Sequence, residues 1–265
     1  KNGDDNSAFN IRRYVSTKNS WILWIDTIVD ILCGKAREKE HQFLFSPFAP
    51  RGSRMENFLS SLNGAPSVDD VRFLCSYALS DLSDYITAVF DSSFSLIRYA
   101  EHLTVDERDF ASIEKNLDSP VLTHFYKPVL EKTFKDLSCP DLVCISIPFA
   151  GTFLPALYTA RYFKQRFKDK VFISIGGGFV NTELREANDI ALEKYIDAIS
   201  YDRGYGSYKA LAGYFKKNDE NKLFKLRLFK NGTIREPLWH DVASESYESE
   251  MTFAIVPDYS DIDFS

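Results

Sequence analysis

Short apolar runs separated by amphipathic stretches mark the chain between residues 140 and 208. Residues 142–147, 171–175 and 197–201 are apolar nearly throughout, which is typical of strands buried on both faces. A helical pattern over residues 154–167 connects the first two runs, and another follows the third. This alternation predicts an α/β fold with a parallel sheet, in which ligands bind beyond the carboxyl ends of the strands.

Residues 1–138 carry a helical pattern and predict an α-helical layer that covers one side of the sheet. Apolar steps of three and four predict a helix over 68–90, opened by a capping box of Ser67 and Asp70. A buried helix over 21–33 is expected between a Ser20 cap and Gly34. Residues 35–66 are expected to be irregular, with a short helix near 55–62. A helix is expected over 94–102, followed by a capping box of Thr104 and Glu107. A last helix is expected from Ser119 to about Leu137, and Pro128 should kink or split it.

After residue 221 the spacing of apolar residues changes from a helical pattern to strict alternation. Apolar and basic residues alternate over 224–230, and Asn231-Gly232 is typical of a type I′ turn, so a small surface hairpin is expected. Residues 240–250 are acidic and rich in serine, which indicates a linker. The predicted organisation is therefore a helical layer at 1–138, an α/β unit at 139–220, a hairpin at 221–240 and a linker at 241–265.

The glycine string Gly176-Gly177-Gly178 after the second apolar run is the sharpest signal for a ligand site. Glycines at this position let the backbone approach a ligand or adopt positive φ, although a plain tight turn has the same composition. Asn181 is expected to cap the next turn, with exposed amides facing the crevice. Ser146 is expected to point into the same crevice, or else to bond neighbouring backbone.

Composition narrows the function. The 265 residues carry a net charge of −6 without a basic run, which argues against duplex binding, and no apolar run reaches the length of a membrane span. Cys33, Cys75, Cys139 and Cys144 lack CxxC spacing, so no disulfide framework is expected and a reducing cytosol is the default. All but Cys139 lie in apolar strings and are expected to be buried.

The usual catalytic patterns are missing from the sequence. The four histidines are far apart, and GxSxG, GxGxxG and the P-loop pattern do not occur. The chain is therefore expected to have no active site and no metal site of its own. Its polar start, without an initiator Met, suggests a piece of a longer protein.

Two stretches carry a resemblance to a known family. Residues 140–149 together with Gly-Gly-Gly-Phe-Val-Asn-Thr-Glu-Leu-Arg at 176–185 resemble the N-terminal cobalamin-binding-like domain of radical SAM proteins. The likeness covers 138–215, and Pro-Asp-Tyr-Ser-Asp at 257–261 is similar to the segment that leads into the radical SAM barrel. Over the helices it is weaker.

The resemblance implies a Rossmann-like sheet that lacks its first strands and belongs to a radical SAM enzyme. The [4Fe–4S] cluster, its C-x3-C-x2-C ligands and S-adenosylmethionine would lie in a domain after Ser265. Cobalamin would lie over the carboxyl edge and, because the chain has no DxHxxG, would bind without a lower axial His. The candidate cofactor-binding residues are Ser146, Phe149, Gly151, Thr152, Gly176, Gly177, Gly178, Asn181, Thr182, Asp202 and Gly204.

Three functions stay open at this point. The first is a cofactor-binding module of a cytosolic radical SAM enzyme, with that enzyme's own barrel as partner and no role in nucleic-acid or membrane binding. The second is a degenerate Rossmann-like scaffold that binds no cofactor and docks on the barrel, with Phe149, Phe153 or Phe179 filling the ligand volume. The third, a separate enzyme with a nucleotide cofactor, has no fingerprint in its favour.

Overall fold

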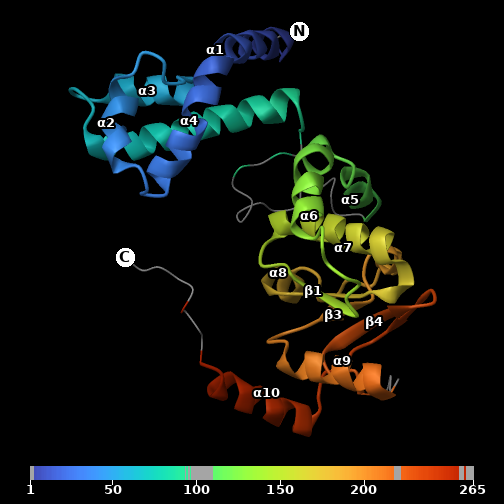
Figure 1. The fold of residues 1–265 in the computed structure, drawn as a ribbon. Helices are drawn as coiled ribbons and strands as arrows, with labels where there is room; N and C mark the ends of the chain where they lie inside the picture. Colours follow the sequence, from blue (N-terminus) through green and yellow to red (C-terminus); the bar gives the residue numbers. More distant parts are fainter. Residues whose placement is uncertain are drawn as a thin grey trace. The chain divides into compact units, whose positions relative to one another are not determined.

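The protein is an α/β chain that forms two compact units, residues 1–96 and 97–265. The computed structural model (Figure 1) describes residues 3–92, 94, 96, 110–217, 222–256 and 260. The predicted helix at 94–102, the capping box of Thr104 and Glu107, and the segment at 257–261 lie largely outside the described residues. No described helix is both long enough and apolar enough to cross a bilayer.

The first unit contains helices and loops but no strand among its described residues. Its elements are α1 (Gly3–Leu32), the 3-10 turn η1 (Arg37–Lys39), α2 (Glu40–Phe45), α3 (Ser53–Ser61) and α4 (Val68–Val89). In the region 35–66, predicted as irregular with a short helix near 55–62, α3 confirms that helix, whereas η1 and α2 were not predicted. Helix α1 starts well before the predicted Ser20 cap, but it ends as predicted. Gly34 has φ of 74°, and the amides of Gly34 and Lys35 donate to the carbonyls of Ile31 and Asp30.

Helix α4 forms as the apolar spacing predicted. The Asp70 carboxylate accepts hydrogen bonds from the backbone amide and the hydroxyl of Ser67, both at 2.7 Å. These bonds hold the pKa of Asp70 below its usual value. The inner face of α4 packs into a core with α1, α2 and α3, made of Trp24, Ile28, Phe43, Leu74, Cys75 and their neighbours.

Only one face of α1 is buried, contrary to the prediction of a helix buried all round. Trp24, Ile28 and Ile31 are inside, whereas Ile22 and Leu23 are each about two-thirds exposed, at 66% and 64%. Cys33 is exposed as well, which corrects its prediction as a buried thiol. Cys75 is fully buried, as predicted, and burial raises the pKa of its thiol to about 12.

The second unit is built around a mixed sheet in the order β1-β2-β3-β4-β5. Its strands are β1 (Leu142–Ser146), β2 (Phe172–Gly176), β3 (Ala198–Ser200), β4 (Leu226–Lys230) and β5 (Thr233–Arg235). Strands β1, β2 and β3 are parallel, while β4 runs antiparallel to β3 and β5 antiparallel to β4. The hairpin turns at Asn231 and Gly232, both with positive φ, as the sequence predicted.

Two expectations about the sheet are wrong. Strand β1, predicted as a central buried strand, lies at the edge of the sheet and exposes Cys144 and Ser146. The hairpin is not an appendage on the surface, because β4 extends the main sheet and is buried over Leu226, Arg227, Leu228 and Phe229. Arg227 is tolerated inside because its guanidinium pairs with Glu236 at 2.8 Å and donates to the backbone carbonyls of Arg185 and Ala187.

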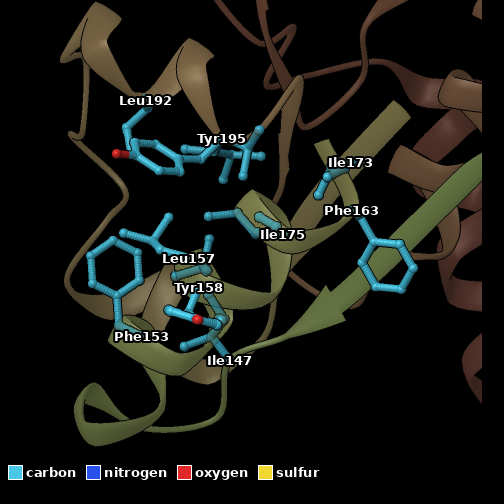
Figure 2. Close-up of a cluster of buried hydrophobic side chains, with 14 of the residues drawn as sticks. Ile147, Phe153, Leu157, Tyr158, Phe163, Ile173, Ile175, Leu192 and Tyr195 are labelled. Atoms are coloured by element: carbon cyan, nitrogen blue, oxygen red, sulfur yellow. The ribbon is translucent and has the colours of Figure 1, made fainter. Parts of the chain in front are cut away.

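Helices cover both faces of the sheet (Figure 1). On one face, α7 (Phe153–Phe167) packs with the sheet into the main core, which Figure 2 shows around Ile147, Leu157, Ile173 and Ile175. On the other face, α9 (Tyr205–Lys217) packs Leu211 against Ala198, Leu226 and Leu228. The helices are α5 (Phe110–Asn116), the π turn η3 (Leu122–Tyr126), α6 (Lys127–Thr133), α7 (Phe153–Phe167), α8 (Gly178–Thr182), α9 (Tyr205–Lys217) and α10 (Val242–Ala254), with 3-10 turns η4 (Ala150–Thr152), η5 (Lys168–Lys170) and η6 (Ile190–Lys194).

Three of these helices bear on the predictions. The helix after Ser119 divides into η3 and α6 beside Pro128, as expected of a residue that cannot donate to the preceding turn, and it ends at Thr133. Helices α5 and α6, predicted within the layer at 1–138, belong to the second unit. The stretch predicted as a linker is helix α10, capped by Asp241, whose side chain accepts from the Ser244 amide at 2.8 Å.

Candidate functional site

The candidate site is the carboxyl edge of the parallel strands, where β1, β2 and β3 end at Ser146, Gly176 and Ser200. The loops that leave these ends carry the predicted binding residues. Ser146 pairs with Gly176 in the ladder between β1 and β2, so the two are brought together as expected. The contacts between the loops determine whether a ligand has room at this edge.

The first and second loops are joined backbone to backbone. The amide of Ile147 donates to the carbonyl of Gly176 at 2.7 Å, and the amide of Phe179 donates to the carbonyl of Ile147 at 3.0 Å. Gly177 has φ of 106°, and a Cβ there would lie 2.7–2.9 Å from backbone atoms of Ile147. A Cβ on Gly178 would lie 3.0 Å from the carbonyl oxygen of Pro148. The glycines therefore admit protein backbone, at the place where the sequence predicted a ligand.

Aromatic side chains fill the interior beneath these loops. The rings of Phe153 and Phe179 lie 5.5 Å apart, and their side chains are only 2% and 4% exposed. Ile147 beside them is fully buried, and Figure 2 shows Ile147 and Phe153 among the core residues. Two of the three phenylalanines named for a filled crevice are thus inside, whereas Phe149 is 49% exposed.

The outer rim of the edge is largely exposed, and the hydroxyls of its two threonines have local partners. Ser146, Phe149, Gly178 and Thr182 are exposed, while Gly151 is buried and Thr152 is half-buried. The Thr152 hydroxyl donates to the carbonyl of Phe149 at 2.7 Å, and the Thr182 hydroxyl donates to that of Gly178 at 3.3 Å. The hydroxyls of both threonines are therefore already bonded to local backbone.

Asn181 joins the second loop to the third. Its side-chain oxygen accepts from the Asp202 amide at 2.7 Å, and its side-chain nitrogen donates to the Asp202 carbonyl at 3.4 Å. Asn181 was predicted as a helix cap facing the crevice, but it lies inside α8 and its amide group is used to hold Asp202. Gly204, with φ of 83°, lies in the same third loop.

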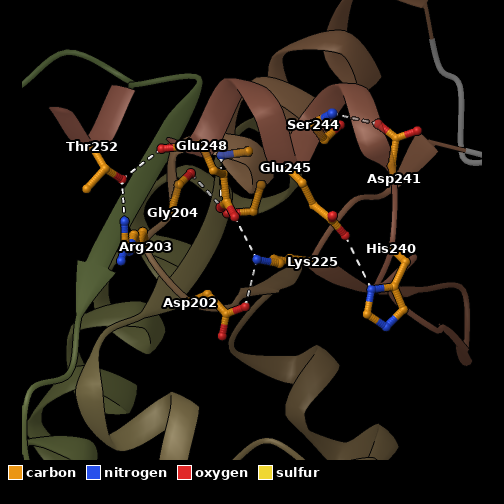
Figure 3. Close-up of polar contacts among 12 residues, drawn as sticks. Asp202, Arg203, Gly204, Lys225, His240, Asp241, Ser244, Glu245, Glu248 and Thr252 are labelled. Atoms are coloured by element: carbon orange, nitrogen blue, oxygen red, sulfur yellow. Dashed lines mark hydrogen bonds and ion pairs between the residues drawn. The ribbon is translucent and has the colours of Figure 1, made fainter. Parts of the chain in front are cut away.

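Asp202 is the start of a chain of ion pairs (Figure 3). Its carboxylate binds Arg185 at 2.9 Å and Lys225 at 2.9 Å, and Lys225 also binds Glu248 at 2.6 Å. Burial raises the pKa of Asp202, but hydrogen bonds from Arg185 and Lys225 outweigh this effect and leave the pKa below its usual value. Burial likewise lowers the pKa of Lys225, and the bonds to Glu248 and Asp202 leave it raised. Asp202 and Lys225 therefore both stay charged at neutral pH.

Helix α10 supplies the buried end of this cluster. The Glu248 side chain is 8% exposed, and it also accepts from the Gly206 amide at 3.3 Å. Arg203 donates to the Thr252 hydroxyl at 2.6 Å. An open recess of about 470 Å³ lies here, lined by Asp202, Arg203, Lys225, Glu245, Glu248 and Ser249. Of the predicted site residues, only Asp202 lines this recess.

Sequence reasoning missed Arg185, Lys225 and Glu248. Arg185 was noted only as part of the resemblance, and Lys225 as a polar residue of the hairpin. A signal for α10 did exist, because Asp241 precedes Tyr247 and Met251 at helical spacing, and both are half-buried. The acidic, serine-rich composition of the segment obscured it.

The described residues offer little for cofactor or metal chemistry beyond this edge. Among them, no three His, Cys, Asp or Glu side chains come together as a metal site. The thiols of Cys33, Cys139 and Cys144 are exposed, which corrects the prediction for Cys144. No family model, curated protein or solved structure matches the chain.

We expect Gly177→Ala to destabilise the second unit by about 3 kcal/mol, because the new Cβ strains a positive φ and collides with the Ile147 backbone. Chemical denaturation of the variant measures this loss. Gly213→Ala is the matched control, since a Cβ there meets nothing within 4 Å and α9 should gain about 0.5 kcal/mol. Equal stabilities of the two variants would contradict the backbone contact.

We expect Lys225→Met to cost about 3 kcal/mol, because it leaves the Glu248 carboxylate buried without its cation. Adding Glu248→Gln removes that charge, so the double variant should be more stable than Lys225→Met alone. Chemical denaturation checks both, with Lys216→Met on the exposed side of α9 as a control that changes stability by less than about 0.5 kcal/mol. A double variant no more stable than Lys225→Met would refute the coupling.

Proposed function

We propose that the second unit is a non-catalytic scaffold of a larger radical SAM enzyme, and that its carboxyl edge docks on that enzyme's catalytic domain without enclosing a cofactor. The contact between Gly177 and Ile147 carries this proposal. The two loops that would have to separate around a corrin are hydrogen bonded to each other at 2.7 and 3.0 Å. A ligand at the glycine string would have to break these bonds first.

The interior of the edge also favours a scaffold over a cofactor site. Phe153 and Phe179 occupy the volume beneath the loops, and the side chain of Asn181 is bonded to Asp202. Opening that volume would expose two large aromatic side chains, each worth about 2 kcal/mol of burial. The chain also has no DxHxxG to ligate cobalt from below.

The radical SAM assignment of the parent enzyme rests on the resemblance of residues 140–149 and 176–185. In this proposal the [4Fe–4S] cluster and S-adenosylmethionine belong to the catalytic domain, whose C-x3-C-x2-C motif this chain does not contain. The exposed thiols of Cys33, Cys139 and Cys144 fit a reducing cytosol. The threonine hydroxyls of the exposed rim are bonded to local backbone, which favours a protein surface over a small-ligand site that needs directed polar groups.

A second candidate keeps cobalamin at the edge. The exposed side chain of Phe149 and the exposed backbone of Gly178 and Thr182 form a rim on which a flat corrin could lie without entering the core. Cobalamin would then contact only the outer residues of the predicted set and would bind without a His ligand.

Titration of the purified chain with hydroxocobalamin and methylcobalamin, followed by visible absorbance and calorimetry, separates the two candidates. The scaffold predicts no saturable change up to high micromolar cofactor. Phe125 is another exposed phenylalanine and serves as the control. Saturable binding that Phe149→Ala weakens at least tenfold, and that Phe125→Ala leaves unchanged, would overturn the scaffold in favour of a corrin on the rim.

The parent enzyme has its own test. The coding sequence downstream of Ser265 should continue into a domain with C-x3-C-x2-C. A reading frame that ends or continues without this motif would refute the radical SAM assignment. The cobalamin titration is independent of that outcome, so the two proposals can fail separately.

A further inference from the structure

Strand β1 presents an open edge of a parallel sheet. It pairs with β2 alone, and none of the residues described by the structure pairs with its outer side. Its sequence, Leu-Val-Cys-Ile-Ser, is apolar on both faces, yet Cys144 and Ser146 are exposed and the other three residues are only half-buried. The strand thus has the composition of a central strand and the position of an edge strand.

The β1 edge also lacks the features that normally prevent an edge strand from pairing with a strand of another chain. Natural edge strands carry charges, prolines or bulges that stop other strands from pairing with them. No charged residue or proline occurs between Leu142 and Ile147, and β1 pairs with β2 without a bulge. Within the described part of the first unit, residues 3–92, 94 and 96, no strand forms that could cover it.

We propose that β1 pairs antiparallel with β1 of a second copy of this chain, joining the two sheets across a twofold axis at Cys144. This register pairs all five residues of the strand. It sets Val143 opposite Ile145 of the other copy and Leu142 opposite Ser146, with the two Cys144 residues facing each other. Pro140 and Pro148 bound the strand and disfavour a longer or shifted pairing.

The side chains of β1 are complementary to themselves in this register. Opposite residues of an antiparallel pair point to the same face of the sheet. Val143 and Ile145 both pack against the main core, whereas Leu142 packs against the cluster under α9. The twofold axis therefore sets β-branched side chains against each other on one face, and it brings no charge opposite a like charge. A second copy of β1 therefore supplies a complementary strand, and no other segment is needed to pair with this edge.

Light scattering coupled to size exclusion measures the proposed dimer in the full chain. We expect twice the 30.4 kDa of one copy, falling toward one copy on dilution. Cys144→Ser keeps the edge neutral and should leave the mass unchanged. Cys144→Lys sets two like charges directly opposite each other and should give the mass of a single copy. A wild-type chain of single mass at every concentration, or a Cys144→Lys chain of double mass, would overturn the proposal.

Disulfide formation gives a second readout that needs no charged variant. Residues directly opposite in an antiparallel pair have Cα atoms about 4.5–5.5 Å apart, which is within the range that a disulfide spans. A variant that keeps only Cys144 should form a covalent dimer under mild oxidation. A variant that keeps only Cys139, which is exposed but lies outside the paired strand, should not. Failure of the Cys144 variant to cross-link, or equal cross-linking by both, would rule out this register.

Discussion

A steric constraint at one glycine determines the carboxyl edge of the sheet. The backbone of Gly177 lies so close to that of Ile147 that any side chain would collide with it. This closeness allows the hydrogen bonds that join the first loop to the second, and it places Phe179 beside Phe153 over the core. A glycine string that suggests ligand access from the sequence therefore closes the edge in the folded chain.

The third loop is held largely by side chains, since Asn181 bonds the backbone of Asp202 and the Asp202 carboxylate forms ion pairs. Asp202 and Lys225 both adopt positive φ, and their ion pair connects the end of β3 to the start of β4. Glu248 extends the connection to α10, so a helix far along the sequence is fixed to the same edge. Because its three charged residues are partly or fully shielded from water, this cluster is screened by salt far less than a surface ion pair.

Local signals in the sequence predicted a large part of the fold. The capping box of α4, the Gly34 end of α1, helix α7, the parallel strands and the turn at Asn231 all depend on neighbouring residues, and all form as expected. The errors arose where distant contacts decide the outcome. Whether β1 is central or at an edge depends on which strands exist elsewhere, and the burial of Glu248 on α10 depends on Lys225, which lies far away in the sequence. The same limit applied to the site, since spacing alone cannot distinguish a glycine that admits a ligand from one that admits backbone.

The two cysteines of the first unit differ in what a thiol reagent can reach. Cys75 is sealed in the core and its raised pKa keeps it protonated, whereas Cys33 is exposed. Alkylation of Cys75 therefore requires the first unit to open, while Cys33 can react in the folded unit. The rate of Cys75 alkylation therefore measures how often the first unit opens, independently of the second unit.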